Sequence, residues 1–148
     1  MSSADPMKRR AVVIVISSAI GWIAGTAAQC LVAIADSPGW YLSHPWEAVA
    51  AGMSGSPTYA LAPILLIATT ALALPRRSST ALYATVAVAW VALTFGWWAR
   101  TAVSYNAAFP WWGFERHFLF ALPAALACAL AFGLTLRGTR ARGDARAS

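Results

Sequence analysis

The sequence predicts an all-α membrane protein, built as a bundle of four transmembrane helices in a single domain, residues 1–148. Three observations predict this class: the composition, four long apolar stretches and the placement of the basic residues. The chain is 59% hydrophobic and 11% charged, whereas soluble domains average roughly 45–50% and about 25%. So few charged side chains do not cover the apolar surface of a soluble domain of this size.

Four apolar stretches have the length that a membrane crossing requires. A hydrocarbon core of ~30 Å is crossed by ~20 helical residues, and about 17–25 are tolerated. In the second stretch, Pro57 suits a first helical turn, where its missing N–H is not needed, and Pro63 predicts a bend. The polar tails 1–8 and 138–148 are expected to be disordered. The four stretches are, approximately, residues 11–35, 58–74, 81–103 and 118–136.

The basic residues predict the orientation of the four helices. Nine of the eleven lie on one side of the membrane if the helices alternate in direction: Lys8, Arg9, Arg10, Arg76, Arg77, Arg137, Arg140, Arg142 and Arg146. Cytoplasmic flanks of transmembrane helices carry an excess of Lys and Arg. Both termini are therefore expected in the cytoplasm, and the protein is expected in the cell inner or plasma membrane as a multi-pass protein.

The first stretch has a second interpretation, a cleavable signal peptide. A basic start, an apolar run and the small residues Thr26-Ala27-Ala28 resemble such a peptide and its cleavage site. The apolar run continues through residues 31–35, which is too long for a typical signal and suits a spanning helix. We favour the uncleaved anchor. Cleavage would leave the other three helices in the same orientation.

The expected partners are the lipid bilayer and another membrane protein or a second copy of the chain. Gly21 and Gly25 form a GxxxG pattern, which lets helices approach closely, either within the bundle or in a homodimer. Nucleic acid is not an expected partner, because the basic side carries almost no aromatic groups that could stack on bases. The arginines instead fix the topology and contact anionic headgroups.

The first of two aromatic-rich extracytoplasmic loops is predicted to contain a short interfacial helix. Pro45 can occupy its first turn, with His44 or Ser43 as the cap and Glu47 near its positive end. Gly52 and Gly55 are expected to end this helix before the second apolar stretch begins.

Aromatic residues gather on the outer side of the predicted bundle. Six of the eight tryptophans lie in or beside the outer loops: Trp40, Trp46, Trp97, Trp98, Trp111 and Trp112. An aromatic belt at the membrane interface explains those at helix ends, and the others are expected to pack the two loops together as a lid. The alternative is a binding platform.

The third stretch carries a stripe of residues on one helical face. It consists of Tyr83, Ala87, Trp90, Thr94, Trp97 and Thr101, at spacings of three and four. The favoured interpretation is a ridge that faces lipid or the core. The alternative is one wall of a cavity for a flat lipophilic molecule such as a quinone.

Candidate binding residues are the outer ionisable groups and the tryptophans beside them. Arg100, near the end of the third helix, is expected either to pair with Glu47 or Glu115 or to reach the headgroups. The two histidines and two nearby acids could bind a metal, but two solvated histidines are favoured, so no metal or cofactor is predicted. The candidate ligand-binding set is Arg100, His44, Glu47, Glu115, His117, Trp97, Trp111 and Trp112.

The sequence offers no pattern for a particular reaction. No serine or cysteine nucleophile stands in a recognisable elbow, and no acid lies within the four stretches to couple ions to transport. We expect an accessory or structural subunit, or a partner, of a larger membrane system. The alternatives are a binding protein or enzyme for a lipid or lipophilic ligand at the outward face, and an oligomeric channel or permease.

Overall fold

Every described element of the protein is helical. The computed structural model describes residues 6–77, 79–104 and 111–144, without the side chains of residues 6, 76, 111–116 and 140–144. The elements are α1 (Pro6–Asp36), α2 (Pro38–Ser43), α3 (Pro45–Ser56), the π-helix η1 (Pro57–Leu61), α4 (Ala62–Ala73), the 3₁₀ turn η2 (Pro75–Arg77), α5 (Thr80–Ser104) and α6 (Trp111–Asp144).

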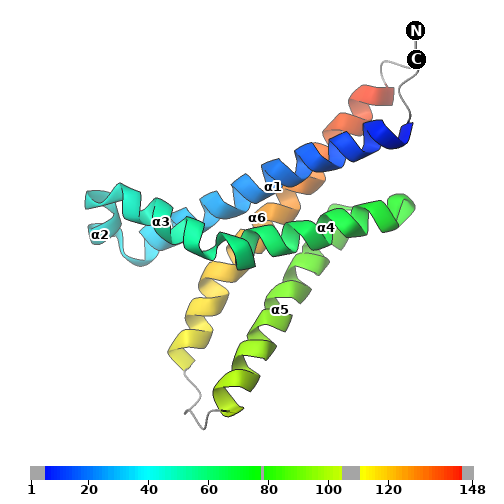
Figure 1. Ribbon diagram of the computed structural model, residues 1–148. Helices are drawn as coiled ribbons and strands as arrows, with labels where there is room; N and C mark the ends of the chain where they lie inside the picture. The colour runs from blue at the N-terminus through cyan, green and yellow to red at the C-terminus, as the bar shows by residue number, and fades with distance from the viewer. Residues whose placement is uncertain (1–5, 78, 105–110, 145–148) are drawn as a thin grey trace.

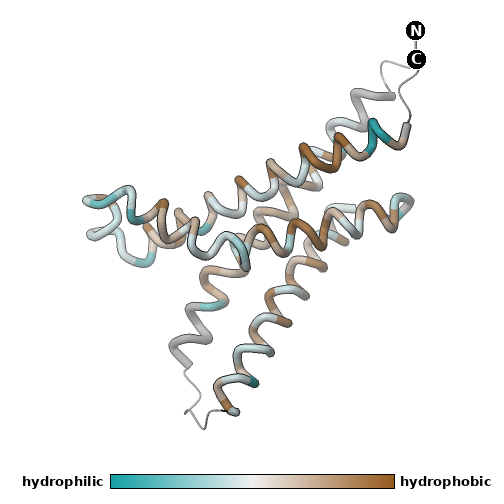
Figure 2. Tube along the Cα trace, in the orientation of Figure 1, coloured by the Kyte–Doolittle hydropathy of each residue, from teal (hydrophilic) through white to brown (hydrophobic). Residues whose placement is uncertain are grey.

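Four helical segments are long and apolar enough to cross a membrane, which confirms the predicted number of spans by length and composition. They are Met7–Asp36, Pro45–Ala73, Thr80–Ser104 and His117–Thr139. Figure 2 shows hydrophobic residues along the middle of these segments and hydrophilic residues at the start of α1 and around α2. The chain therefore has the architecture of a small multi-pass membrane protein.

The first and last helices extend further than the sequence predicts. α1 begins at Pro6 and α6 continues to Asp144, so both helices enter the expected tails 1–8 and 138–148. The added residues of α1 include Met7 and Lys8, which have high helix propensity. Once a helix exists, each further residue adds a hydrogen bond without a new nucleation step.

α3 differs from the predicted interfacial helix in how it ends. It begins at Pro45 as expected, but it runs through η1 into α4 as one continuous helical segment. Gly52 and Gly55 do not end it, because they pack against α1: a Cβ on Gly52 would lie 3.2 Å from the Thr26 carbonyl oxygen. The glycines thus serve a close helix contact and not a chain turn.

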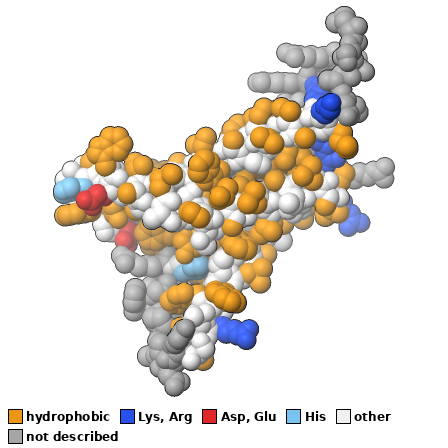
Figure 3. All heavy atoms as spheres, in the orientation of Figure 1, with side chains coloured by type: hydrophobic (Ala, Val, Ile, Leu, Met, Phe, Trp, Pro, Cys, Tyr) orange, Lys and Arg blue, Asp and Glu red, His pale blue; other side chains and the backbone are white. Residues whose placement is uncertain are grey.

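The helices form two arms that converge at one end of the molecule (Figure 1). α1 begins and α6 ends at this end, and the α4–α5 connection lies on the same side; we call it the terminal end. Arg10 of α1 donates a hydrogen bond to the Ala71 carbonyl oxygen of α4 there, at 2.5 Å. Lys and Arg side chains gather at the terminal end in Figure 3. At the opposite, loop end, the arm that carries α2 and α3 separates from the arm formed by α5 and the first half of α6.

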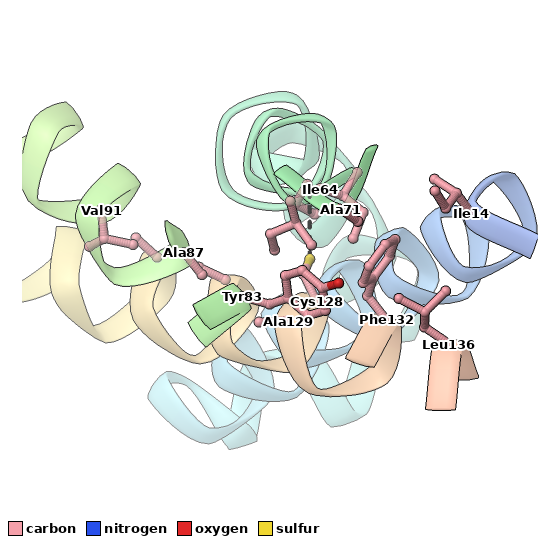
Figure 4. Packing of buried hydrophobic residues seen from close by; sticks show 14 residues of the cluster. Ile14, Ile64, Ala71, Tyr83, Ala87, Val91, Cys128, Ala129, Phe132 and Leu136 are labelled. Carbon is pink, nitrogen blue, oxygen red and sulfur yellow. Dashed lines mark hydrogen bonds between the residues drawn. The ribbon is translucent and has the colours of Figure 1, made fainter. Parts of the chain in front are cut away.

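The core lies where the two arms converge (Figure 4). Tyr83 of α5 packs edge-on against Phe132 of α6, with ring centroids 5.0 Å apart. Ile64 of α4 is buried beside them, and the Cys128 thiol donates to the Ala60 carbonyl oxygen at 3.6 Å. These side chains fill the space between the helices, so the opening between the arms has a closed floor.

The GxxxG pattern of α1 is in contact with α6 of the same chain. A Cβ on Gly21 would lie 3.0 Å from the Cys128 carbonyl oxygen, and one on Gly25 would lie 3.0 Å from the Ala124 carbonyl oxygen. Both glycines are buried. The close approach predicted for Gly21 and Gly25 therefore occurs within the bundle, which is one of the two predicted possibilities. A homodimer through the same glycines remains a separate prediction.

Candidate ligand-binding cleft

Two cavities lie side by side where the arms separate. The polar cavity, of about 560 Å³, lies between α1, α3 and the start of α6, and its lining includes Gln29, Asp36, Ser54 and Phe120. The aromatic cavity, of about 440 Å³, lies between η1, α5 and α6, and its lining includes Thr58, Trp90, Leu93, Thr94 and Trp97. Both cavities share Tyr59, Trp98 and His117.

His117 connects three elements at the boundary between the cavities. Its Nδ1 lies 3.1 Å from the Tyr59 hydroxyl of η1, and its Nε2 lies 3.2 Å from the Thr94 hydroxyl of α5. The imidazole also meets the Tyr59 ring edge-on, with centroids 5.3 Å apart. A neutral imidazole has one donor and one acceptor nitrogen. The Thr94 hydroxyl donates to the Val91 carbonyl oxygen, so it accepts from His117 Nε2, and the Tyr59 hydroxyl then donates to Nδ1. Both ring nitrogens are therefore satisfied and the ring is fixed in place.

The chain is locally a π-helix at Tyr59, and Pro63 leaves one carbonyl oxygen of this turn without a backbone partner. In η1 the Ala62 N–H donates to the Pro57 carbonyl oxygen, five residues back. The same register would pair the Thr58 carbonyl oxygen with residue 63, which is proline and has no N–H. The indole N–H of Trp90 donates to the Thr58 oxygen instead, at 2.8 Å. Trp90 thereby anchors α5 to η1 at the aromatic cavity. Such π-turns are frequent at functional sites.

Gln29 is the buried polar group of the polar cavity. It is 2% exposed, and its Oε1 atom has no hydrogen-bond partner among the described residues. The amide fits against α3 because Gly55 has no side chain: a Cβ there would lie 2.7 Å from Nε2. An unpartnered buried acceptor costs about 1–3 kcal/mol.

The predicted site residues fall into separate groups. His117 lines both cavities, and Trp97 lines the aromatic one, where it is 73% exposed. Arg100 is exposed and is not among the described residues that line either cavity. Trp111, Trp112 and Glu115 lie in the first turns of α6, and their side chains are outside the described part of the structure.

His44 and Glu47 form a local cluster with Trp40 at the loop end. The His44 ring stacks on the Trp40 indole, with centroids 4.2 Å apart. The Trp40 indole N–H donates to a Glu47 carboxylate oxygen at 2.6 Å. Within the described side chains, no group of three or more His, Cys, Asp or Glu residues could hold a metal ion.

Sequence reasoning missed two of the residues that shape the cavities, Gln29 and Tyr59. Gln29 is the only glutamine of the chain and lies within an apolar stretch, and a polar side chain at membrane depth is costly unless it has a role. The presence of a glutamine in this apolar stretch could have identified Gln29 as a candidate residue. Tyr59 follows Pro57 by two residues, and its role depends on the π-turn, for which the sequence shows no local pattern.

The stripe on α5 divides between the core and the cleft. Tyr83 and Ala87 are buried in the core, whereas Trp90, Thr94 and Trp97 line the aromatic cavity. The first half of the stripe therefore faces the core, and the second half forms part of a cavity wall; a lipophilic occupant of that cavity stays a prediction. The fold and this cleft define a small all-helical protein with four apolar segments of membrane-spanning length. Comparison with protein-family models, with curated proteins and with solved structures found no match.

Proposed function

We propose that this protein binds a lipophilic molecule in the aromatic cavity, on the extracytoplasmic side of the membrane. The observation that carries the proposal is the position of His117, fixed by Tyr59 and Thr94 beside a cavity walled by tryptophans. Membrane and ligand sites commonly combine an apolar wall with a few placed polar groups. Here the indole rings supply the apolar wall, and the His117 ring, held by Tyr59 and Thr94, supplies a polar edge of fixed position.

The ligand would enter from the lipid. Leu93 and Trp97 line the cavity and are also exposed on the surface of α5, at 67% and 73%. Because α5 is one of the spanning segments, this surface faces hydrocarbon in our proposal. Tyr83 and Phe132 are buried and pack against each other between α5 and α6, which favours a binding site over a pore through one chain.

Photolabelling in nanodiscs tests the proposal. The probe is a dodecyl glycerol ether with a diazirine at the end of its chain. We expect saturable labelling of the α5 peptide that contains Trp90 and Trp97, and competition by the unmodified ether. Thr94→Phe places a ring in the cavity where the ligand would lie, so labelling should weaken at least about tenfold, a loss of about 1.4 kcal/mol of binding free energy.

The matched control for this experiment is Thr101→Phe. Thr101 lies on α5 two turns further along, is exposed, and is not among the described residues of the cavity lining. Its labelling should equal that of the unmodified protein. Labelling that does not saturate, and that spreads over all lipid-facing helices in both variants, would show simple partition into the bilayer and would contradict the proposal.

A second candidate is an accessory subunit of a larger membrane system. The α2–α3 region favours it, because Leu42 and Trp46 there are 72% and 81% exposed, and tryptophan is enriched at protein interfaces. The complex extracted from its native membrane in a mild detergent should then exceed the mass of one chain, and Trp46→Ser should reduce that mass. A single chain in both samples would contradict this candidate.

A further inference from the structure

Basic side chains collect at the terminal end of the molecule, whereas the acids with described side chains, Asp36 and Glu47, lie at the loop end (Figure 3). Five basic residues with described side chains, here called the terminal cations, come from three elements: Lys8, Arg9 and Arg10 of α1, Arg77 of η2 and Arg137 of α6. Arg10 is half-buried and the other four are exposed. Within the described part of the chain none of the five forms an ion pair, so their charge is uncompensated there.

Two contacts hold these three elements against one another. Arg10 donates to the Ala71 carbonyl oxygen, which lies in the last turn of α4, just before η2. After η2, the start of α5 packs closely against α6, because a Cβ on Gly133 would lie 2.7 Å from the Thr80 hydroxyl oxygen. Arg137 follows Gly133 by about one helical turn. The start of α1, η2 and the end of α6 therefore belong to one packed unit, and the terminal cations share one end of it.

The Arg10 side chain is held in place by a carbonyl oxygen that its own helix does not satisfy. In a continuing helix the Ala71 oxygen would accept from residue 75, but residue 75 is proline and has no N–H. Arg10 supplies the missing donor. A guanidinium carries five N–H donors, and within the described structure this side chain makes no other hydrogen bond. Its remaining donors can therefore bond to an acceptor outside the protein, and phosphate oxygens match the fork of an arginine.

The terminal cations lie at the depth expected for lipid headgroups. Lys8 and Arg137 fall near the outer ends of the spanning segments Met7–Asp36 and His117–Thr139, and Arg77 lies between the second and third segments. The first segment has 30 residues and a length of about 45 Å, which exceeds the ~30 Å hydrocarbon core, so its ends reach the headgroup level. Clusters of about four to eight basic residues beside a membrane attract anionic lipids. A lipid phosphate therefore has both the charge and the depth that this end requires.

We propose that the terminal end binds the headgroup of an anionic phospholipid in one site formed jointly by α1, η2 and α6. A phosphate diester there offsets the repulsion among the terminal cations and bridges the three elements, so the bound lipid stabilises the bundle. Orientation by the positive-inside rule requires only the number of basic residues on one side, whereas this site depends on three elements that pack together. The proposal is independent of any ligand of the aromatic cavity, which lies where the arms separate.

Unfolding of the purified protein in dodecyl maltoside micelles tests which ligand binds. Dioleoyl phosphatidylglycerol, dioleoyl phosphatidylcholine and inorganic phosphate are added at equal phosphate concentration, and unfolding is followed by circular dichroism. Phosphatidylglycerol should raise the unfolding temperature in a saturable way, and salt should weaken this effect by screening. The other two additives should leave the temperature unchanged. An equal rise with phosphatidylcholine would contradict an anionic headgroup, and an equal rise with inorganic phosphate would contradict a lipid ligand.

One exposed arginine from each element tests whether the site is formed jointly. Arg9→Gln, Arg77→Gln and Arg137→Gln should each raise the phosphatidylglycerol concentration at half of the temperature rise about fivefold, the ratio expected for about 1 kcal/mol per basic residue. Arg10 is left unchanged, because its loss would also free the Ala71 carbonyl oxygen.

Arg100→Gln is the control for these three variants. Arg100 is also an exposed arginine on a spanning helix, but it lies at the loop end, so its loss should leave the half-rise concentration unchanged. If Arg100→Gln weakens binding as much as the other variants, net charge alone attracts the lipid and the joint site is wrong. Weaker binding in only one of the three terminal-end variants would also overturn the proposal, since the site would then belong to one element.

Discussion

His117 shows what a single side chain contributes to this fold. One imidazole bonds to η1 through Tyr59 and to α5 through Thr94, so three of the four spans meet at it. The sequence marked His117 as a candidate binding residue, because it is one of the ionisable groups on the predicted outer side. The partners lie 58 and 23 residues away along the chain, and no local pattern contains that information.

Arg100 gives a prediction at the residue scale. Its side chain is exposed, and Glu47, one of its two predicted partners, accepts a hydrogen bond from Trp40. Exposed charges contribute little to stability. Arg100→Gln should therefore change the free energy of unfolding by no more than about 0.5 kcal/mol, as measured by unfolding in nanodiscs at low and high salt.

Arg116→Gln is the comparison for Arg100→Gln, and the two variants should behave alike. A large loss of stability for Arg100→Gln alone would contradict this expectation. It would show that Arg100 has a buried, charged partner, which its removal leaves unpaired. If the added change Glu115→Gln then recovered part of the loss, it would identify Glu115 as that partner.

At the scale of elements, helix type and approximate position could be predicted from the sequence, and helix continuity could not. The apolar stretches located all four spans, because period and length alone carry that signal. Gly52 and Gly55 suggested a helix end, since glycine is common there. Their actual role is to admit Cys30 and Gln29 of α1, and this depends on a neighbour distant in the chain.

The α1–α6 contact gives a prediction for glycine. At Gly25 a Cβ would collide with the Cys128 sulfur and lie 3.0 Å from the Ala124 carbonyl oxygen. Gly25→Leu must therefore separate the two helices, with a cost of at least about 1–3 kcal/mol. We expect a clearly lower unfolding temperature in detergent, measured by circular dichroism.

Gly96→Leu is the matched control for Gly25→Leu. Gly96 lies on α5, is exposed, and a Cβ there meets no described atom within 4 Å. The same chemical change should therefore leave the unfolding temperature unchanged or slightly higher, because leucine is the better helix former. Equal effects at both positions would contradict the α1–α6 packing. Loss of a dimer in Gly25→Leu, with no change in unfolding temperature, would instead support the homodimer.

At the scale of the whole molecule, the arrangement of the spans follows from a few physical rules, whereas the cleft does not. Alternating helices of sufficient length, with basic residues at one end, are predictable because lipid and charge act on every such chain in the same way. The separation of the arms at the loop end depends on individual contacts, such as Trp90 with Thr58 and His117 with Tyr59. The sequence suggested the α5 wall of the cleft, but the polar cavity beside it was not predicted.

The orientation of the bundle gives the last prediction. α1 begins and α6 ends at the terminal end (Figure 1), where Lys8, Arg9, Arg10 and Arg137 lie, and the positive-inside rule predicts that this end lies in the cytoplasm. In a variant with Cys30→Ala and Cys128→Ala, single cysteines at Ser43 and Ser104 should react with an impermeant maleimide in intact cells. Cysteines at Ser78 and Ser148 should react only after permeabilisation. Reaction at Ser78 but not at Ser148 in intact cells would contradict the four-span arrangement, because Ser78 joins the second span to the third and lies on the same side as the C-terminus in that arrangement. Reaction at both Ser78 and Ser148, with protection at Ser43 and Ser104, would instead reverse the bundle and place the cleft on the cytoplasmic side.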